Sequence, residues 1–408
     1  MKCRHCHTEL TLPLIDLGAA PPSNAYLNKQ SVHAPEIYFP LRVLVCTECW
    51  LVQTEDYAGA GELFSADYAY FSSFSTTWLK HAEQYIGDMA LRFALNENSH
   101  IVEVAANDGY LLQYAKARGI PCLGIEPTTS TAVAARAKGI EIVEAFFGAT
   151  LARKLAAQGK QADLAAANNV LAHVPDINDF VGGFAVLLKP AGVATFEFPH
   201  LLRLVSDNQF DTIYHEHYSY LSLTAVKRIF ECNGLSVFDV EELPTHGGSL
   251  RVYAQRKDSG GREISQRVAI LLERETAAGM NSTAFYAGFQ AKANKVKNDL
   301  LVFLIEAQRT GKSVAGYGAA AKGNTLLNYA GVRPDLLPYV VDRNPAKQDK
   351  FLPGCRIPIV AEAQLKQTRP DYVLILPWNL LAEVIEQLAY VREWGGQFVT
   401  SVPVLEIR

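Results

Sequence analysis

The sequence predicts an α/β protein with two successive Rossmann-like sheets and a small metal-stapled domain before them. Short apolar strands alternate with helical stretches from about residue 100, and the alternation begins again at "SVAGYGAAAKG". This pattern is typical of βαβ units in a parallel sheet. Two C-x-x-C pairs near the start of the chain predict the metal-stapled domain. At 408 residues the chain is also too long for one ordinary core.

Composition narrows the class of protein. The chain is 49% hydrophobic and 20% charged, without an apolar run of about 18 residues, so we expect no membrane partner. Met1 is not followed by a basic stretch and an apolar segment, which predicts a cytoplasmic protein without a signal peptide. A net charge of -4 gives no general attraction to phosphate polymers, so we expect no nucleic-acid partner.

The first predicted domain, residues 1–72, contains the cysteine pairs and short alternating strands such as "EIYFPLRVLVC". Each pair can present two thiolates to one tetrahedral ion from a tight turn. The alternative is a pair of disulfides or reduced thiols. Because this domain buries little apolar area, a metal is the better explanation, and we predict Zn²⁺. The predicted metal ligands are Cys3, Cys6, Cys46 and Cys49.

The second predicted domain, residues 73–258, has the strands "HIVEVAAND", "GIPCLGIEPT", "ADLAAANNVLAHV" and "GVATFEFP". It ends with two strands around a glycine turn, which we interpret as an antiparallel pair that completes the sheet. The third predicted domain, residues 259–408, begins with helical periodicity to about residue 310, expected as two helices. A second Rossmann-like unit follows it.

Polar residues at the ends of successive strands predict a cofactor site. The turn after the first strand opens a helix, where backbone amides can approach a ligand, and a carboxylate ends the next strand, where it can accept both ribose hydroxyls. This order is typical of class I S-adenosylmethionine methyltransferases. A nicotinamide enzyme is the alternative, but the loop lacks G-x-G-x-x-G and carries Ala105 and Ala106 where glycine is usual. The predicted cofactor contacts are Glu103, Asn107, Gly109, Glu126, Pro127, Asn168 and Asn169.

The segment "FDTIYHEHYSYLS" combines two histidines, a glutamate and tyrosines within a few positions. Acid–base side chains and phenols at that density are costly to bury, which favours a catalytic role. A packed aromatic turn is the alternative, above all for His215 and Tyr218.

Several motifs in one order extend over nearly the whole chain: the four cysteines, "AANDGYLLQ", "NNVLAHVPD", "FEFPH", "YHEHYSYLS" and "GYGAAAKGNTLLNY". Together they resemble the sugar C-methyltransferases that methylate C-3 of nucleotide-linked 4-keto deoxysugars. The resemblance implies a zinc-binding domain, a class I methyltransferase domain and a Rossmann-like domain without a cofactor of its own. It implies S-adenosylmethionine as cofactor and a nucleotide-diphosphate-linked 4-keto sugar as substrate.

The resemblance also implies roles for single residues. His217 is expected to remove the C-3 proton, with Tyr214 and Glu216 beside it to hold the sugar or the developing oxyanion. His173 is expected to donate to the ketone oxygen. Tyr68 is the predicted tyrosine that reaches the reacting centre from the end of the first domain, and Tyr70 is a predicted substrate contact.

The last glycine loop, "GYGAAAKGN", can offer backbone amides and one cation to a diphosphate. A vestigial dinucleotide site is the alternative there. The turn "THGGSLR" fits a plain hairpin turn as well as a sugar contact. The remaining predicted substrate contacts are His200, Gly316, Gly318, Lys322 and Asn324.

Two other functions stay open at this point. An O- or N-methyltransferase acting on a sugar or a small metabolite would use the same cofactor domain. A zinc-finger interaction protein would need a basic surface near the cysteines, but that region is rich in acidic residues. The sequence does not fix the nucleotide, the sugar or the oligomeric state, and it is compatible with a monomer.

Overall fold

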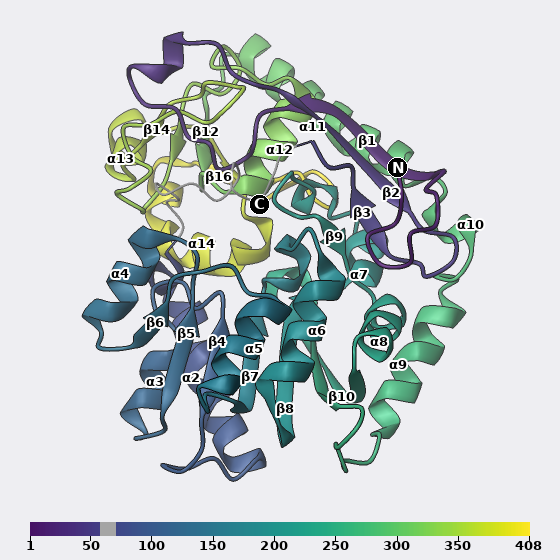
Figure 1. Ribbon diagram of the computed structural model, residues 1–408. Coiled ribbons are helices and arrows are strands. Elements are labelled where there is room, and N and C mark those ends of the chain that lie inside the picture. Colours follow the sequence, from purple (N-terminus) through teal and green to yellow (C-terminus); the bar gives the residue numbers. More distant parts are fainter. Residues whose placement is uncertain (58–70) are drawn as a thin grey trace.

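The computed structural model describes residues 1–57 and 71–408, and these residues form three sheets (Figure 1). The first sheet is antiparallel and pairs its strands in the order β1-β2-β3-β9. Its last strand comes from the middle of the chain, inside the segment "YHEHYSYLS". The histidine-rich segment is therefore part of the N-terminal sheet. Its elements are β1 (Leu12–Ala20), η1 (Ser31–His33), β2 (Phe39–Val45), β3 (Val52–Thr54) and β9 (Ser219–Tyr220).

The second sheet has seven strands in the order β10-β11-β8-β7-β4-β5-β6. The neighbours from β8 to β6 are parallel, whereas β11 is antiparallel to both β8 and β10. The predicted antiparallel pair is thus present, with its second strand inserted between the first strand and the parallel part. The strands are β4 (Ile101–Val104), β5 (Cys122–Ile125), β6 (Glu141–Val143), β7 (Ala162–Asn168), β8 (Leu188–Pro199), β10 (Leu235–Leu243) and β11 (Ser249–Arg256).

Helices cover both faces of this sheet. The longer ones are α2 (Thr76–Arg92), α3 (Leu112–Ala117), α4 (Thr129–Ala137), α5 (Ala149–Ala157), α6 (Ile177–Leu187), α8 (Leu223–Cys232) and α9 (Gln266–Ala277). Side chains of α2, α3 and α4 share one core with the sheet, and those of α5, α6, α8 and α9 share another. Short elements at the edge complete it: η2 (Ser72–Phe74), η3 (Leu171–His173), α7 (Leu201–Ser206), η4 (Phe210–Thr212) and η5 (Thr245–Gly247).

The third sheet has the order β14-β13-β12-β15-β16-β17 and is parallel except for β17. Its strands are β12 (Val314–Tyr317), β13 (Val340–Val341), β14 (Ile359–Val360), β15 (Tyr372–Ile375), β16 (Gln397–Thr400) and β17 (Glu406–Ile407). Its helices are α12 (Ala321–Ala330), α13 (Ala363–Thr368), η6 (Trp378–Leu380), α14 (Leu381–Gln387) and η7 (Ala389–Trp394). Both predicted Rossmann-like units are therefore present.

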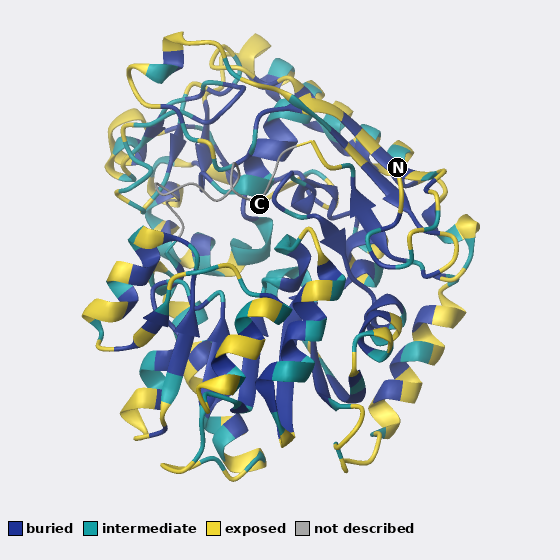
Figure 2. Ribbon diagram, viewed as in Figure 1, coloured by how far each residue is buried: buried dark blue, intermediate teal, exposed yellow. Residues whose placement is uncertain are grey.

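The connection between the second and third sheets contains the two expected helices, α9 and a longer one, with one additional turn between them. After α9 come a single turn, α10 (Thr283–Tyr286), and the long α11 (Phe289–Arg309). The N-terminal sheet lies along α11 (Figure 1) and shares a buried core with α11 and α12. The first and last parts of the chain are thus packed as one body, and a continuous buried interior joins them (Figure 2). No helix of the described residues is long and apolar enough to cross a membrane.

Candidate active site and metal centre

The two cysteine turns have the same backbone geometry. Cys3 N–H donates to the Thr8 carbonyl at 2.8 Å, and Cys46 N–H donates to the Leu51 carbonyl at 2.9 Å. In each turn the residue after the second cysteine has a positive φ of 62°. This repeated turn directs both thiols of a pair to one side, as a metal knuckle requires.

The four sulfurs converge. All lie within 4.8 Å of one another, and three of the separations are 3.4–3.6 Å. A disulfide needs about 2.05 Å between sulfurs. Four thiolates bound tetrahedrally at about 2.3 Å from Zn²⁺ would lie about 3.8 Å apart. The donor set and its spacing therefore fit zinc and not disulfides. The ligands would be Cys3, Cys6, Cys46 and Cys49.

The predicted cofactor loop follows β4. Ala105, Asn107 and Gly109 have φ values of 60°, 48° and 75°, so the chain turns tightly at the end of the strand. A Cβ on Gly109 would lie 2.4 Å from the Ile140 side chain, so only glycine fits there. Ala105 adopts the conformation of the glycine that the sequence lacks at that position.

Glu103 on β4 is a fully buried carboxylate, 0% exposed. Neither of its oxygens has a hydrogen-bond donor among the described residues, although the Tyr110 ring lies nearby. Burial raises its pKa well above the usual value. An orphaned buried acceptor at the end of a strand suits a ligand that brings its own N–H or O–H donors.

Glu126, directly after β5, is fixed by two backbone amides. Its carboxylate accepts from Asn107 N–H at 2.9 Å and from Thr128 N–H at 2.9 Å. Each oxygen keeps a second lone pair for a hydroxyl group. The half-buried Pro127 follows it. The loop after β4 and the carboxylate after β5 are therefore joined, as a bidentate ribose site requires.

At the end of β7, Asn168 and Asn169 each have a buried side-chain oxygen without a partner among the described residues. Asn168 is paired in register with Glu197 on β8. Burial opposes the charge of Glu197, but His81 at 2.9 Å and Arg251 at 3.0 Å hold its pKa below the usual value. The end of β7 therefore presents two amide oxygens that can accept hydrogen bonds from a ligand. The adjacent Glu197 is held in place by His81 and Arg251.

His217 lies between the second and third sheets, just before β9. Its Nδ1–H donates to the Thr212 carbonyl at 2.8 Å, which places the acceptor lone pair on Nε2. Burial, and then the neighbouring His173, lower its pKa well below the ordinary value. His217 is therefore a neutral imidazole with a basic nitrogen at physiological pH, as a general base must be.

His173 lies edge-on to His217, with ring centroids 4.6 Å apart. Burial lowers its pKa to about 4. Tyr214 packs over the other side of His217 at 4.0 Å. The structure thus brings three of the predicted catalytic side chains together, although they come from two segments far apart in the sequence. Tyr68 and Tyr70 lie outside the described residues.

Glu216 is buried and accepts from the Asn24 side-chain amide at 2.8 and 2.9 Å. Asn24 belongs to the loop between β1 and β2, and the next residue but one, Tyr26, donates to the Ala319 carbonyl at 2.6 Å in the third sheet's glycine loop. The carboxylate is therefore oriented by the first domain.

His215 and Tyr218 have packing roles, in agreement with the alternative considered for them. His215 Nε2 donates to the carbonyls of Phe39 and Pro40 at 3.2 and 3.3 Å, so its ring faces β2 and not His217. The Tyr218 ring lies 4.9 Å from the Arg4 guanidinium. Both residues attach the histidine-rich segment to the N-terminal domain.

His200 is placed differently from the expectation. Its side chain is 1% exposed and donates to Glu275 of α9 at 2.7 Å. Glu275 also accepts from the Leu223 and Thr224 amides at 2.7 and 2.8 Å. His200 therefore joins α7, α8 and α9 inside the core, and we leave it out of the proposed substrate site.

The glycines of the third domain's loop make room for neighbours. A Cβ on Gly316 would meet Val340 at 2.7 Å, and a Cβ on Gly318 would meet Pro377 at 2.6 Å. Asp342 accepts from the Ala319 amide at 2.8 Å. The loop is thus closed by a carboxylate of its own chain, as in a vestigial dinucleotide site. Asn324 is buried, and its amide nitrogen lacks a partner among the described residues.

Lys322 opens α12 toward the second sheet. Its Nζ donates to Asn379 at 2.6 Å and lies 4.6 Å from the Trp378 ring. Trp378 Nε1 donates to Asp211 at 2.8 Å. Burial lowers the pKa of Lys322, with Asp211 opposing the change, and burial raises the pKa of Asp211 to about 6. The Lys322 ammonium is close enough to His217 and His246 to lower the pKa of both. Among the described residues, no carboxylate forms an ion pair with Lys322.

Sequence reasoning missed four residues that shape this site. Asn24 orients Glu216, and the Thr212 carbonyl fixes the tautomer of His217. His246, in the "THGGSLR" turn, accepts from the Asn169 amide at 3.3 Å, and burial lowers its pKa to about 4. Arg4 binds backbone carbonyls next to both histidines. Only the turn containing His246 had been singled out by its composition.

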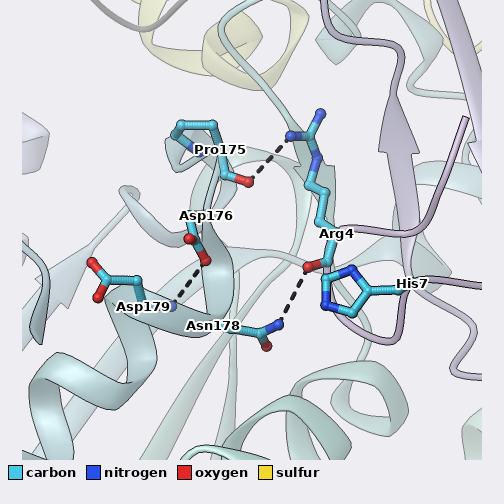
Figure 3. A pocket seen from close by; sticks show the side chains of 6 residues that line it. All are labelled: Arg4, His7, Pro175, Asp176, Asn178 and Asp179. Atoms are coloured by element: carbon cyan, nitrogen blue, oxygen red, sulfur yellow. Dashed lines mark hydrogen bonds between the residues drawn. The ribbon is translucent and has the colours of Figure 1, made fainter.

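A surface hollow of about 490 Å³ opens beside the first cysteine turn and the start of α6 (Figure 3). It is lined by Arg4, His7, Pro175, Asp176, Asn178 and Asp179. Its polar groups are engaged with one another: Asn178 donates to the Arg4 carbonyl at 3.3 Å and Asp176 caps α6 at Asp179. This hollow is separate from the predicted cofactor edge, so we do not take it as the active site.

Models of three protein families match the chain in succession: a zinc binding domain at residues 3–64, a methyltransferase domain at 78–240 and a C-methyltransferase C-terminal domain at 244–403. C-methyltransferase NovU of Streptomyces niveus is 33% identical over 402 residues, which cover 98% of this chain and 95% of that protein.

Solved structures also align with part of the chain. The magnesium protoporphyrin IX methyltransferase of Synechocystis PCC 6803 with bound S-adenosylmethionine is 14% identical, over 44% of this chain and 79% of that one, with a TM-score of 0.34. The PH0226 protein of Pyrococcus horikoshii OT3 is 14% identical, over 46% and 95%, with a TM-score of 0.38. At these scores the structural matches carry no argument.

The strand order of the second sheet, its antiparallel β11 and the acceptors at its carboxyl edge define a class I methyltransferase that uses S-adenosylmethionine. The N-terminal cysteine cluster adds a zinc-binding domain to it. The sequence matches then place the chain more narrowly: it belongs to the family of S-adenosylmethionine-dependent C-methyltransferases that includes NovU.

Proposed function

We propose that the protein adds a methyl group to C-3 of a nucleotide-diphosphate-linked 4-keto hexose through an enolate, in the biosynthesis of branched deoxysugars. The neutral His217 carries this proposal. Its Nδ1 is committed to the Thr212 carbonyl, and its basic Nε2 belongs to a ring beside His173 at the junction of the sheets. A carbon acid next to a ketone needs such a base to form its enolate.

The chain's own groups divide the work as follows. His217 Nε2 takes the C-3 proton, and the electron pair of the broken C–H bond moves into the enolate. His173, whose pKa burial lowers to about 4, is proposed to stabilise the enolate oxygen from beside His217. Tyr214 and Glu216 hold the sugar, and Tyr68 is proposed to reach the same centre.

We assign the remaining contacts by position. Glu103, Asn107, Gly109, Glu126, Pro127, Asn168 and Asn169 would hold S-adenosylmethionine, which supplies the methyl group as an electrophile. The half-buried cation Lys322, with Asn324, Gly316 and Gly318 from the same part of the third domain, would face the diphosphate. Tyr70 is proposed as a further substrate contact. The absence of a contacting carboxylate at Lys322 among the described residues supports an anionic ligand there.

The test combines a substrate panel with a proton-exchange assay. Labelled S-adenosylmethionine and a panel of nucleotide-linked 4-keto sugars should give a product labelled at C-3, and the protein alone should exchange the C-3 hydrogen with deuterated water. His217→Asn should bind both ligands but lose about a hundredfold to ten-thousandfold in both reactions.

His215→Asn is the matched control, because the His215 ring packs against Phe39 and donates to the backbone carbonyls of Phe39 and Pro40. The folded fraction of His215→Asn should retain both methyl transfer and C-3 proton exchange. A His217→Asn enzyme with near-normal turnover would reject the base assignment. Methylation of oxygen or nitrogen on the same panel, without C-3 exchange, would favour the alternative, an O- or N-methyltransferase.

A further inference from the structure

Arg4 lies inside the first cysteine turn, between Cys3 and Cys6, and its side chain extends toward Pro175 (Figure 3). Its guanidinium donates to three backbone carbonyls: Thr54 at 3.0 Å, Pro175 at 3.2 Å and Tyr218 at 3.2 Å. It also forms a bidentate ion pair with Asp56. All five N–H groups of the guanidinium therefore have acceptors.

Two of these carbonyls lie next to the proposed catalytic histidines. Pro175 follows His173 by two residues, and Tyr218 directly follows His217. The third carbonyl belongs to Thr54 of β3, whose hydroxyl donates to the His217 carbonyl at 3.1 Å. One cation therefore joins the two histidine segments to each other and to the N-terminal sheet.

Neighbouring groups enclose the Arg4 side chain, whereas its partner Asp56 is half exposed. The Arg4 side chain is 4% exposed, and its guanidinium lies 4.9 Å from the Tyr218 ring centre. Its backbone N–H donates to Gln53 at 2.9 Å, and its carbonyl accepts from Asn178 at the start of α6. Arg4 thus has fixed neighbours on β3, on α6 and on both histidine segments.

We propose that Arg4 is a positioning residue: it sets the separation and tilt of the His173 and His217 rings, and so couples the cysteine-rich domain to proton abstraction. Arg4 would act through the backbone carbonyls that lie next to these rings in the sequence. A planar fork of donors can reach three carbonyls and a carboxylate at once, which a lysine ammonium cannot do. This inference rests on the proposed roles of His173 and His217.

The hollow beside Arg4 makes a rescue experiment possible, because it can admit free guanidinium ion to the vacated position (Figure 3). Arg4→Ala should lower kcat about 10- to 100-fold through misplaced rings, with the KM for S-adenosylmethionine within about threefold of its starting value. Guanidinium at millimolar concentration should restore part of kcat. Arg4→Lys should fall between the two enzymes.

A readout that does not depend on activity is the ¹⁵N spectrum of histidine-labelled protein, with the His217 signals assigned by their loss in His217→Asn. Arg4→Ala should shift the His217 ring signals, and guanidinium should move them back. Zinc content is measured for each variant, so that the effect of a lost metal ion can be distinguished from the effect of the lost Arg4 guanidinium.

Arg228→Ala is the control. Arg228 donates to the Glu48 carbonyl in the second cysteine turn and thus also supports the metal domain, but it contacts neither histidine segment. It should keep kcat within twofold and show no response to guanidinium. If Arg4→Ala does not fold, Arg4→Lys and Asp56→Asn are measured in its place, with a smaller loss of kcat expected.

A zinc-replete Arg4 variant with unchanged kcat and unchanged His217 signals would overturn the inference. So would equal losses in Arg4→Ala and Arg228→Ala, because they would indicate a general effect of the metal domain. A fully active His217→Asn enzyme would instead reject the proposed function, whatever the Arg4 variants do. The two failures are therefore distinguishable.

Discussion

Three half-buried imidazoles, His173, His217 and His246, lie at the junction of the second and third sheets, and desolvation lowers the pKa of each. The groups that face them are Lys322 from α12, Asp211 from η4, and Glu197 with His81 near the turn of His246. At pH 7 these rings are therefore neutral, and each has one nitrogen lone pair that can accept a hydrogen bond or a proton.

These pKa shifts predict a pH dependence of stability. His246 has a folded pKa of about 4 and an unfolded pKa of about 6.5. Its stabilising contribution is fully present above about pH 6.5 and falls as the pH falls to about 4, by about 1.4 kcal/mol per pH unit, because the unfolded chain binds the proton first.

The measurement compares urea unfolding of the unmodified protein and His246→Gln at pH 7 and pH 5. Asp211, with its raised pKa of about 6, changes stability in the opposite direction but equally in both proteins, so the difference isolates His246. The variant should lose less stability on acidification. Equal losses in both proteins would show that His246 is not held neutral.

A second prediction at this scale concerns Glu126. Glu126→Ala removes the acceptor for Asn107 and Thr128 as well as the proposed ribose contact. We expect S-adenosylmethionine affinity to fall by about 2 kcal/mol, which calorimetry can measure. Glu144→Ala, on the exposed end of the next strand, is a matched carboxylate control with unchanged affinity expected. Unchanged binding in Glu126→Ala would contradict the placement of the cofactor.

At the scale of elements, the cysteine turns are the feature that the sequence predicted most completely. The spacing C-x-x-C allows few geometries other than a knuckle, so the ligand set followed from local sequence alone. The strands of both parallel sheets were predicted for a similar reason, because their apolar runs are short and bounded by turns.

Two features at the scale of elements, the pairing of β3 with β9 and the position of His200, could not be predicted from local sequence. The pairing of β3 with β9 joins Val52 to Tyr220, and each strand is too short to show a period of its own. His200 was misplaced because a histidine after a strand end has the same sequence pattern whether it meets a ligand or a buried partner such as Glu275. Only the three-dimensional arrangement decides between them.

The metal prediction also belongs to this scale. The purified protein should contain about one zinc per chain, and Cys46→Ser should lose it together with several degrees of thermal midpoint, because a structural site contributes folding energy. Elemental analysis and a thermal scan measure both. Cys355→Ser, a buried cysteine outside the cluster, should keep its zinc. Full zinc occupancy in Cys46→Ser would refute the assigned ligand set.

At the scale of the whole molecule, the candidate site is built from all three sheets. His173 comes from the second sheet, His217 from a segment paired with the first, and Lys322 from the third. Sequence patterns identified each sheet separately. They could not identify Asn24 or Arg4, since a contact between domains depends on how the domains pack and leaves no periodicity in either segment.

This packing leads to a prediction about the first domain. A fragment of residues 1–72 should bind zinc through its cysteines yet fail to form its sheet, because β9 and the apolar surface of α11 are missing. Circular dichroism and amide dispersion in NMR spectra measure this, with the full chain as reference. A well-dispersed spectrum with strand content would show that the domain folds independently.

Because β9 lies far along the sequence from β3, the N-terminal sheet cannot be completed until about half of the chain has been synthesised. All four zinc ligands and the first three strands leave the ribosome long before residues 219–220, so the nascent sheet carries an unpaired edge at β3 during that interval. Such an edge invites aggregation. Zinc bound early would hold the two cysteine turns together until the last strand is made. A cell short of zinc during translation would therefore lose soluble protein, while the molecules that do mature would keep their specific activity.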